Sequence, residues 1–220
     1  ALRSQFIHHD RVQQRYEVHI ILHELLKQKC RERGPAFERE CYLRAGDLCR
    51  DEGRTLEALG FFWRIKDYER LLSLDFSHHI FAEISGTPFS EIALDIVRNC
   101  PSDLKKRHPL ALLRIAWVLL ACDLHGDFKK LTVDLQPMIE SMGNEGTLLR
   151  GEWLLLSSFN SYPDLPQMLE TLKKAAPFFS ERCSQVIFPD MPWCILPLQD
   201  FHLRPGEADR EAAALDEYVT

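Results

Sequence analysis

The pattern of apolar and polar residues changes near residue 35. Upstream of it, two short β-prone runs, residues 5–9 and 15–19, flank the polar stretch 10–14, and this arrangement predicts a β-hairpin. Apolar residues at helical spacing then predict a helix from about His19 to Arg33. Gly34–Pro35 ends this helix, because a glycine followed by a proline does not continue a helix.

From Pro35 onward the apolar residues keep a helical period, which predicts short helices joined by short turns. The residues that define these helices are Phe37, Cys41, Ala45, Leu48 and Cys49; Leu56, Leu59 and Trp63; Tyr68, Leu71 and Leu72; Ile92, Ile96 and Val97; Leu110, Leu113, Trp117, Leu120 and Leu124; Phe128, Leu131, Leu135, Met138 and Met142; Leu149, Trp153 and Leu156; Met168, Leu169 and Leu172. The chain is therefore predicted to be all-α after the hairpin.

Prolines mark several of the predicted boundaries. Thr87 is predicted to cap a helix that has Pro88 at its first position, and Pro109 is predicted to open a helix that is apolar on two sides. A helix of that kind lies between neighbours. Pro137 is predicted to kink its helix. Residues 177–205 are rich in proline and apolar side chains, and we expect an ordered connection packed on the helices before a last helix from Glu207 to Tyr218.

One helix pair has the spacing of a tetratricopeptide repeat. The residues that match the pattern are Tyr42, Ala45, Gly46, Cys49, Gly53, Ala58 and Phe62. Small residues allow two antiparallel helices to approach, and Gly53 permits a tight turn between them. A second, degenerate repeat aligned on Gly126 has Ile115, Leu119, Cys122, Leu131 and Leu135 at the corresponding places. The predicted fold is an α-solenoid of tetratricopeptide-like helix pairs; a four-helix arrangement without true repeats is the alternative.

Composition and charge exclude several functions. A net charge of -6 and a pI near 5.9 argue against direct binding of nucleic acid, which depends on Lys and Arg neutralising phosphates. No apolar run reaches the length of a membrane span, since Arg114 interrupts the longest one. The seven cysteines are irregularly spaced, which favours reduced, buried thiols in a cytoplasmic protein over disulfides or a zinc site.

Candidate chemical groups are few. His19 and His23 have the i, i+4 spacing of metal ligands, but no third ligand is evident, so packing and helix capping are the favoured roles. His8–His9 and His78–His79 are expected at the surface or in turns. Cys41, Cys49 and Cys122 lie on apolar stripes, which favours inert core cysteines over nucleophiles. No catalytic, cofactor-binding or metal-binding residue is predicted, and the residues that contact an effector or partner are not identifiable.

Basic clusters and tryptophans are the remaining candidates. The clusters Lys27–Arg33 and Lys105–His108 are expected to be solvated helix ends, with contact to another domain of the same polypeptide as the alternative. Trp63, Trp117 and Trp153 are expected in the core. Trp193 is the tryptophan best placed to line a groove, although packing is favoured there as well.

Several segments resemble the large ATP-dependent bacterial activators of the MalT-like class within the LuxR family. Tyr16 to Leu26, with its Tyr-x-x-His leading into an apolar helix, resembles the end of their winged-helix domain. The segment from Cys41 to Leu72 is similar to the entry of their helical arm. His108–Pro109–Leu110 with Ala116–Trp117 and Gly126 resembles a helix pair of that arm, and Arg204 to Asp209 is similar to a segment near its middle.

The resemblance implies an internal fragment of a longer regulator, which agrees with a start at Ala1 that has neither an initiator Met nor a secretory signal. Residues 1–34 would be the end of a winged helix and residues 35–220 the start of a tetratricopeptide-like arm. ATP would bind a missing N-terminal domain, and DNA a missing C-terminal helix-turn-helix. The implied function is non-catalytic: receiving a small-molecule or protein effector and supporting self-association. A freestanding tetratricopeptide-like adaptor that holds a peptide is the alternative.

Overall fold

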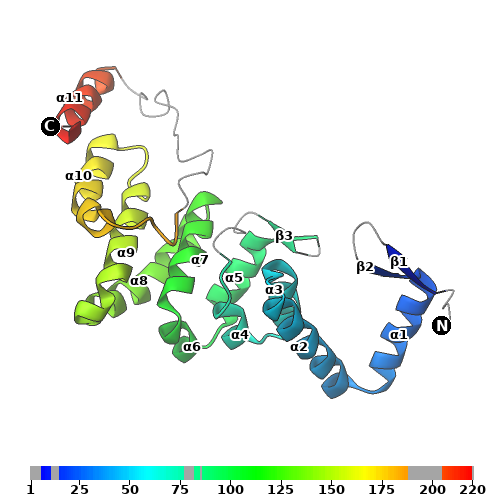
Figure 1. The fold of residues 1–220 in the computed structure, drawn as a ribbon. Helices are drawn as coiled ribbons and strands as arrows, with labels where there is room; N and C mark the ends of the chain where they lie inside the picture. The colour runs from blue at the N-terminus through cyan, green and yellow to red at the C-terminus, as the bar shows by residue number, and fades with distance from the viewer. Residues whose placement is uncertain (1–5, 11–14, 77–81, 85, 188–204, 220) are drawn as a thin grey trace. The chain divides into compact units, whose positions relative to one another are not determined.

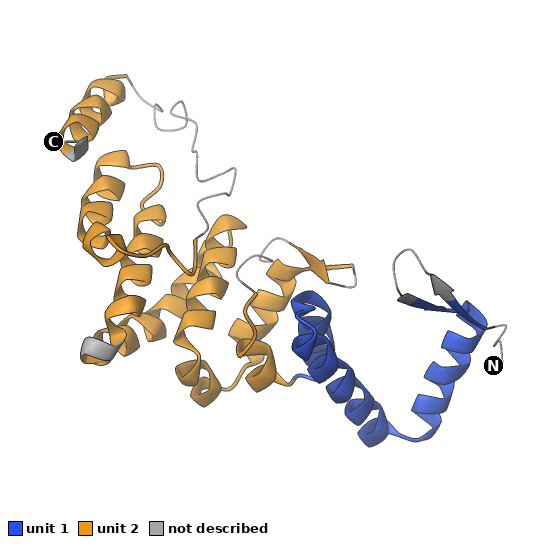
Figure 2. Ribbon diagram, viewed as in Figure 1, with its two compact units in different colours: residues 1–66 blue, residues 67–220 orange. Residues whose placement is uncertain are grey.

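The chain is mostly helical and divides into two compact units. The computed structural model describes residues 6–10, 15–76, 82–84, 86–187 and 205–219 (Figure 1). The units are residues 1–66 and 67–220 (Figure 2). Strands in the described part form two small two-stranded sheets, and none of its helices is long and apolar enough to cross a membrane. The predicted helical class with an N-terminal hairpin is confirmed, whereas the solenoid and the domain boundary at residue 34 stay predictions.

Unit 1 begins with the hairpin and helix that the sequence predicts. Strand β1 (Ile7–Asp10) pairs antiparallel with β2 (Arg15–Val18), and α1 (Ile20–Glu32) follows at once. The predicted stop after α1 is confirmed, because Gly34 adopts a φ of 89° and a proline opens the next helix, α2 (Pro35–Asp51). Helix α3 (Thr55–Arg64) completes the unit.

Helices α2 and α3 pack closely through small residues. A Cβ on Gly46 would lie 2.5 Å from the ring of Phe62, and both Ala58 and Phe62 are fully buried. Gly53 turns the chain with a φ of 73°. The predicted close approach of this pair is confirmed. Leu48 was expected on the same apolar stripe, but it is 57% exposed, because α2 turns Gly46 and Cys49 inward and leaves Leu48 facing outward.

Unit 2 is a series of helices with one short strand pair. Its elements are α4 (Tyr68–Leu72), β3 (Glu83–Ile84), β4 (Thr87–Pro88), α5 (Phe89–Asn99), α6 (Ser102–Arg107), α7 (Pro109–Ala121), α8 (His125–Ser141), the 3-10 helix η2 (Gly143–Gly146), α9 (Thr147–Phe159), α10 (Leu165–Ala175), the 3-10 helix η3 (Ala176–Phe179) and α11 (Glu207–Val219). Figure 1 shows them following one another along the unit.

Helix α7 is the centre of the unit 2 core. Every residue from Ala111 to Leu119 is buried, and α7 contacts α5, α8 and α9. The prediction that this helix starts at Pro109 and lies between neighbours is confirmed. Pro137 lies inside α8 between the buried Leu135 and Ile139, and the kink expected at this proline stays a prediction.

Three local predictions in unit 2 are wrong. Thr87 does not cap a helix: it pairs with Ile84 in the β3–β4 ladder, and α5 begins at Phe89 after an extended Pro88. Gly126 is not the turn residue of a second repeat, because it already lies inside α8 and Asp123 makes the turn with a φ of 60°. Cys122, assigned to the apolar stripe, ends α7 and is exposed.

The proline-rich stretch is described in part. Residues 180–187 are ordered and end in the buried Val186 and Ile187, which confirms the expected packing for this portion. Residues 188–204, which include Trp193, lie outside the described residues. The predicted last helix is α11, and Leu215 on it packs against a small cluster on α10 formed by Leu165, Met168 and Leu169.

Candidate interaction sites

Helix α1 carries several large aliphatic side chains that are exposed to solvent. Ile20 is 71% exposed and Ile21 is 64% exposed, and Leu25 and Leu26 are also largely accessible. None of the residues of α1 is buried. Folded chains seldom leave several large aliphatic side chains of one short helix in water, so these residues indicate a surface that another molecule or segment covers. We call Ile20, Ile21 and Leu25, which together line one hollow on α1, the α1 apolar surface.

The preceding hairpin is amphipathic. Ile7 lies opposite Val18 in the ladder, and His8 lies opposite Glu17. Because side chains alternate along a strand, one face carries Ile7 and Val18 together with Tyr16, and the other carries His8 and Glu17. All of these side chains are exposed. The apolar side of the hairpin thus has the same uncovered character as the α1 apolar surface.

A groove of about 570 Å³ lies between α1, α2 and α3. Leu26, Tyr42 and Phe61 supply its apolar lining, and Lys27, Arg31 and Arg64 supply positive charge. Two half-buried thiols also line it: Cys30 Sγ and Cys41 Sγ are 3.8 Å apart. Partial burial and the neighbouring Cys30 raise the pKa of the Cys41 thiol. The cysteines were predicted to be buried in the core, but this pair borders the groove.

A second hollow, of about 410 Å³, lies among α5, α6, α7 and α8 in unit 2. Leu112, Leu131 and Leu135 form part of its floor. The cations of its rim are Arg98, Lys105, Lys106 and Lys130. An apolar floor beneath a mainly basic rim suits a ligand that is acidic and partly apolar.

Part of that rim is tied down by internal contacts. Asp127 forms ion pairs with Arg98 at 3.3 Å and with Lys130 at 3.4 Å. Partial burial opposes ionisation of Asp127, but the hydrogen bonds and charges of these two cations hold the pKa of its carboxyl below the usual value. Lys105 Nζ donates to the carbonyl of Val97 at 2.5 Å. Lys106, which is exposed, is the rim cation best placed to meet an incoming anion.

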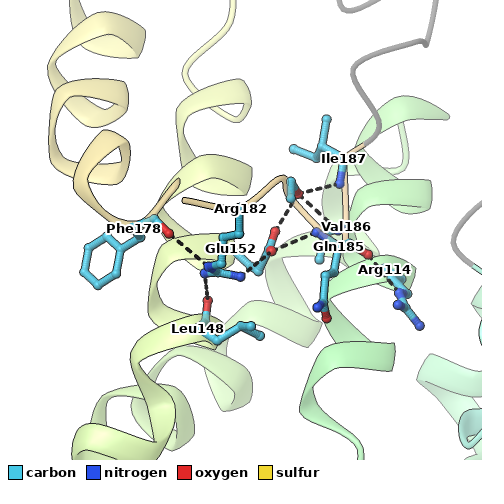
Figure 3. A network of polar contacts seen from close by, with 9 residues as sticks. Arg114, Leu148, Glu152, Phe178, Arg182, Gln185, Val186 and Ile187 are labelled. Carbon is cyan, nitrogen blue, oxygen red and sulfur yellow. Dashed lines mark hydrogen bonds and ion pairs between the residues drawn. The ribbon is translucent and has the colours of Figure 1, made fainter. Parts of the chain in front are cut away.

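A buried carboxylate organises the segment after α10. Glu152 on α9 is fully buried and accepts hydrogen bonds from the Ser184 hydroxyl at 2.6 Å and from the backbone N–H of Gln185 at 2.8 Å (Figure 3). The guanidinium of Arg182 reaches the same carboxylate at 3.5 Å and donates to the carbonyls of Leu148 and Phe178. The hydroxyl oxygen of Ser184 in turn accepts hydrogen bonds from the backbone N–H groups of Val186 and Ile187.

Arg114 on α7 holds the same segment from the other side. Its Nε donates to the carbonyl of Gln185 at 3.0 Å (Figure 3). Its Nη1 pairs with Asp75 at 3.2 Å. Burial lowers the pKa of this guanidinium, and the carboxylates of Asp75 and Glu152 oppose that shift. The buried charges of Arg114 and Glu152 therefore form hydrogen bonds with groups of the protein itself. Their arrangement suits a clamp that pins residues 180–187 onto α7 and α9 better than a site that binds substrate.

The sequence indicates this clamp by placing charged residues at apolar positions of two helices, a sign that the sequence analysis did not use. Glu152 lies three residues after Leu149 and four before Leu156, so a charged residue occupies the buried stripe of α9. Arg114 likewise interrupts the apolar run of α7. Their partners are 30 or more residues away along the chain, for example Gln185 for Glu152, and no local pattern could identify them.

The histidines that sequence analysis singled out have local roles. His19 caps α1: its Nδ1 accepts from the backbone N–H of Ile21 at 3.3 Å, which confirms the capping role. His23 is exposed and lies 3.6 Å from Glu24. His8 is exposed on β1, the side chain of His9 is not described, and His78–His79 lie outside the described residues. Among described side chains, no group of three or more His, Cys, Asp and Glu is placed to hold a metal.

The basic clusters and tryptophans follow the predictions in part. The basic residues of the segment Lys27–Arg33 are exposed at the end of α1, as expected. The second cluster is not wholly solvated, because Arg107 pairs with Glu69 at 2.8 Å and His108 lies 3.2 Å from the same carboxylate. Trp117 is buried as predicted. Trp63 and Trp153 are half-buried.

Comparison of the chain with protein-family models, curated proteins and solved structures found no match.

Proposed function

We propose that this chain is a non-catalytic interaction module within a bacterial LuxR-family, MalT-like transcription activator, where it receives a signal and supports self-association. The observation that carries the proposal is the α1 apolar surface, on which Ile20 and Ile21 are 71% and 64% exposed. Covering such a surface stabilises a complex by about 1.5–3 kcal/mol for each large aliphatic side chain that becomes fully buried.

The proposed occupant of the α1 apolar surface is the remainder of a winged-helix domain in the same polypeptide. A hairpin leading directly into an apolar helix, with Tyr16 and His19 near the junction, is the segment that resembles the end of the family's winged-helix domain. In this proposal residues 1–34 complete that domain, and the helix pairs from residue 35 onward form a tetratricopeptide-like arm in the cytoplasm. ATP and DNA would be bound by other domains of the polypeptide.

The mechanism we propose is a change of packing between helix pairs that an effector or a partner protein stabilises. Such a ligand shifts the equilibrium between a resting form and an oligomer-competent form only by its difference in affinity for the two. The hollow among α5–α8 and the groove beside α1 are the places where the described residues offer an apolar lining with charged groups around it.

The proposal is tested with a double substitution, Ile21→Glu with Leu25→Glu, in the full-length polypeptide. Nucleotide-dependent self-association and promoter binding are expected to fall by about tenfold or more, because two aliphatic side chains would no longer be buried. Val133→Glu is the matched control, since Val133 is 65% exposed on α8 of the other unit. Circular dichroism of the 220-residue chain should be unchanged for both. Wild-type behaviour of the double variant would contradict the proposal.

A freestanding adaptor is the second candidate, and the hollow among α5–α8 favours it. Its basic rim over an apolar floor would take an acidic peptide with apolar side chains. The two functions differ in gene content: a longer gene that encodes a nucleotide-binding domain and a helix-turn-helix supports the regulator. A gene without either segment would rule out the regulator and leave the adaptor as the proposed function. Binding of an acidic amphipathic peptide would then be compared between the wild type and the variant Lys106→Glu.

A further inference from the structure

The corner between α1 and α2 brings two cysteines together. Cys30 lies in the last turns of α1 and Cys41 in the second turn of α2, on either side of Gly34. Their sulfur atoms are 3.8 Å apart, and both side chains are half-buried at the edge of the groove described above. The two sulfur atoms of a disulfide are about 2.05 Å apart. The two side chains would therefore have to rotate toward each other to bring their sulfur atoms within bonding distance.

We propose that Cys30 and Cys41 form a reversible disulfide that fixes the corner between α1 and α2. This inference is independent of the proposed function, since it uses only the contact between the two thiols and the weak packing of α1. Because α1 has no buried residue, little else in the described part of unit 1 holds this helix in place against α2. A covalent bond across the corner would restrain α1, and with it the α1 apolar surface.

The surroundings set the order of the steps. The thiolate is the reactive form of cysteine. The Cys41 thiol has a raised pKa, which lowers its thiolate fraction at neutral pH. Cys30 is therefore the attacking thiol and Cys41 the resolving one.

The oxidant is a low-molecular-weight disulfide such as glutathione disulfide. The Cys30 thiolate attacks one sulfur of that disulfide, the small S–S bond breaks, and one thiolate leaves. The Cys41 thiolate then attacks the Cys30 sulfur of the mixed disulfide and expels the second small thiolate. Two protein thiols are oxidised to one cystine, one small disulfide is reduced to two thiols, and the two protons of the cysteines pass to the leaving thiolates.

The experiment exposes the reduced 220-residue chain to glutathione disulfide, alkylates the remaining thiols and maps the products by mass spectrometry. We expect a mass decrease of two hydrogen atoms, a linked Cys30–Cys41 peptide, and full release of the link by dithiothreitol. Cys122→Ser, which removes an exposed cysteine, is the matched control and should form the same link. In Cys30→Ser the link should be absent and Cys41 should be alkylated.

Two results would overturn the inference. One is that Cys30 and Cys41 stay alkylatable under conditions in which the exposed Cys122 and Cys183 become glutathionylated. The other is that Cys41 links to either of those cysteines as readily as to Cys30. The restraint is measured separately by trypsin cleavage at Arg33, which should be roughly tenfold slower or more in the oxidised chain. Equal cleavage rates in the oxidised and reduced chains would refute the claim that the bond fixes the corner.

Discussion

At the scale of single residues, Glu152 is a fully buried charged group whose carboxylate is bonded within the protein. Its carboxylate is fully buried and is held by Arg182, Ser184 and Gln185. Removing one partner from a buried charge network is expensive, because the remaining groups lose their acceptor without regaining water. Glu152 is therefore the residue on which the attachment of residues 180–187 depends.

Glu152→Ala is expected to destabilise the chain by about 3–5 kcal/mol. Glu152→Gln keeps one carbonyl oxygen as an acceptor and should lose about 1–3 kcal/mol. The measurement is the urea unfolding midpoint. The control Glu170→Ala removes an exposed carboxylate that pairs with Lys174 on α10, and it should leave the midpoint unchanged. A Glu152→Ala variant as stable as that control would show that the clamp does not hold the segment.

Tyr68 links stability to pH at the alkaline end. Its hydroxyl donates to Asp95 Oδ2 at 3.0 Å, and burial together with that carboxylate raises the pKa of the tyrosine well above 10.0. The folded chain therefore keeps the proton when the unfolded chain loses it. The contribution is fully present below pH 10.0 and is lost as the pH rises toward the higher folded value.

Tyr68→Phe should lower the free energy of unfolding by about 1 kcal/mol at pH 7, because one hydrogen bond is lost. Above the ordinary tyrosine pKa the stability of the wild type should fall with pH more steeply than that of the variant. Urea unfolding of both proteins at neutral pH and near pH 10.5 tests this. Parallel pH profiles for the two would contradict the assigned role of Tyr68.

At the scale of elements, the α2–α3 pair depends on the absence of a side chain at Gly46. The Phe62 ring, itself fully buried, occupies the place of a Cβ on Gly46. Gly46→Ala is expected to destabilise the chain by about 1–3 kcal/mol through overpacking, despite the higher helix propensity of alanine. The unfolding midpoint of Gly126→Ala is the control, because Gly126 also lies in a helix but a Cβ there would meet open space. Equal effects of the two substitutions would show that the close approach is not under strain.

The elements that could be predicted are those whose signals are local. Residue spacing predicted the hairpin and α1. Glycine and proline predicted the corner at Gly34–Pro35 and the start of α7 at Pro109. The prediction that Thr87 caps a helix was wrong because Thr87 pairs with Ile84 in a strand ladder, and residue spacing does not reveal this pairing. The prediction that Gly126 forms the turn was wrong because Asp123, a non-glycine residue, adopts the positive φ of the turn.

The sites were less predictable than the elements, since they depend on contacts between distant residues. Cys30 and Cys41 meet only because the chain reverses between α1 and α2, and cysteine spacing alone indicated inert thiols. The network around Glu152 joins α9 to a segment beyond α10. A charged residue within an apolar helix stripe was the available sign in the sequence, as it also is for Arg114.

At the scale of the whole molecule, unit 2 has a well-packed core, whereas the first helix of unit 1 has no buried residue. Helix α7 lies inside the unit 2 core, whereas α1 presents Ile20, Ile21, Leu25 and Leu26 to solvent. A short helix without a packed face is marginal in water, because most helix stability in proteins comes from tertiary packing. The proposed function requires α1 to acquire such a face in the longer polypeptide.

Amide hydrogen exchange of α1 tests this requirement most directly. In the 220-residue chain, the amides of Ile20–Glu32 should exchange much faster than those of Pro109–Ala121, since little packing protects them. In the full-length polypeptide the exchange of α1 should slow by about two orders of magnitude or more, once its apolar surface is covered. Exchange of α1 at the same rate in both proteins would contradict the account.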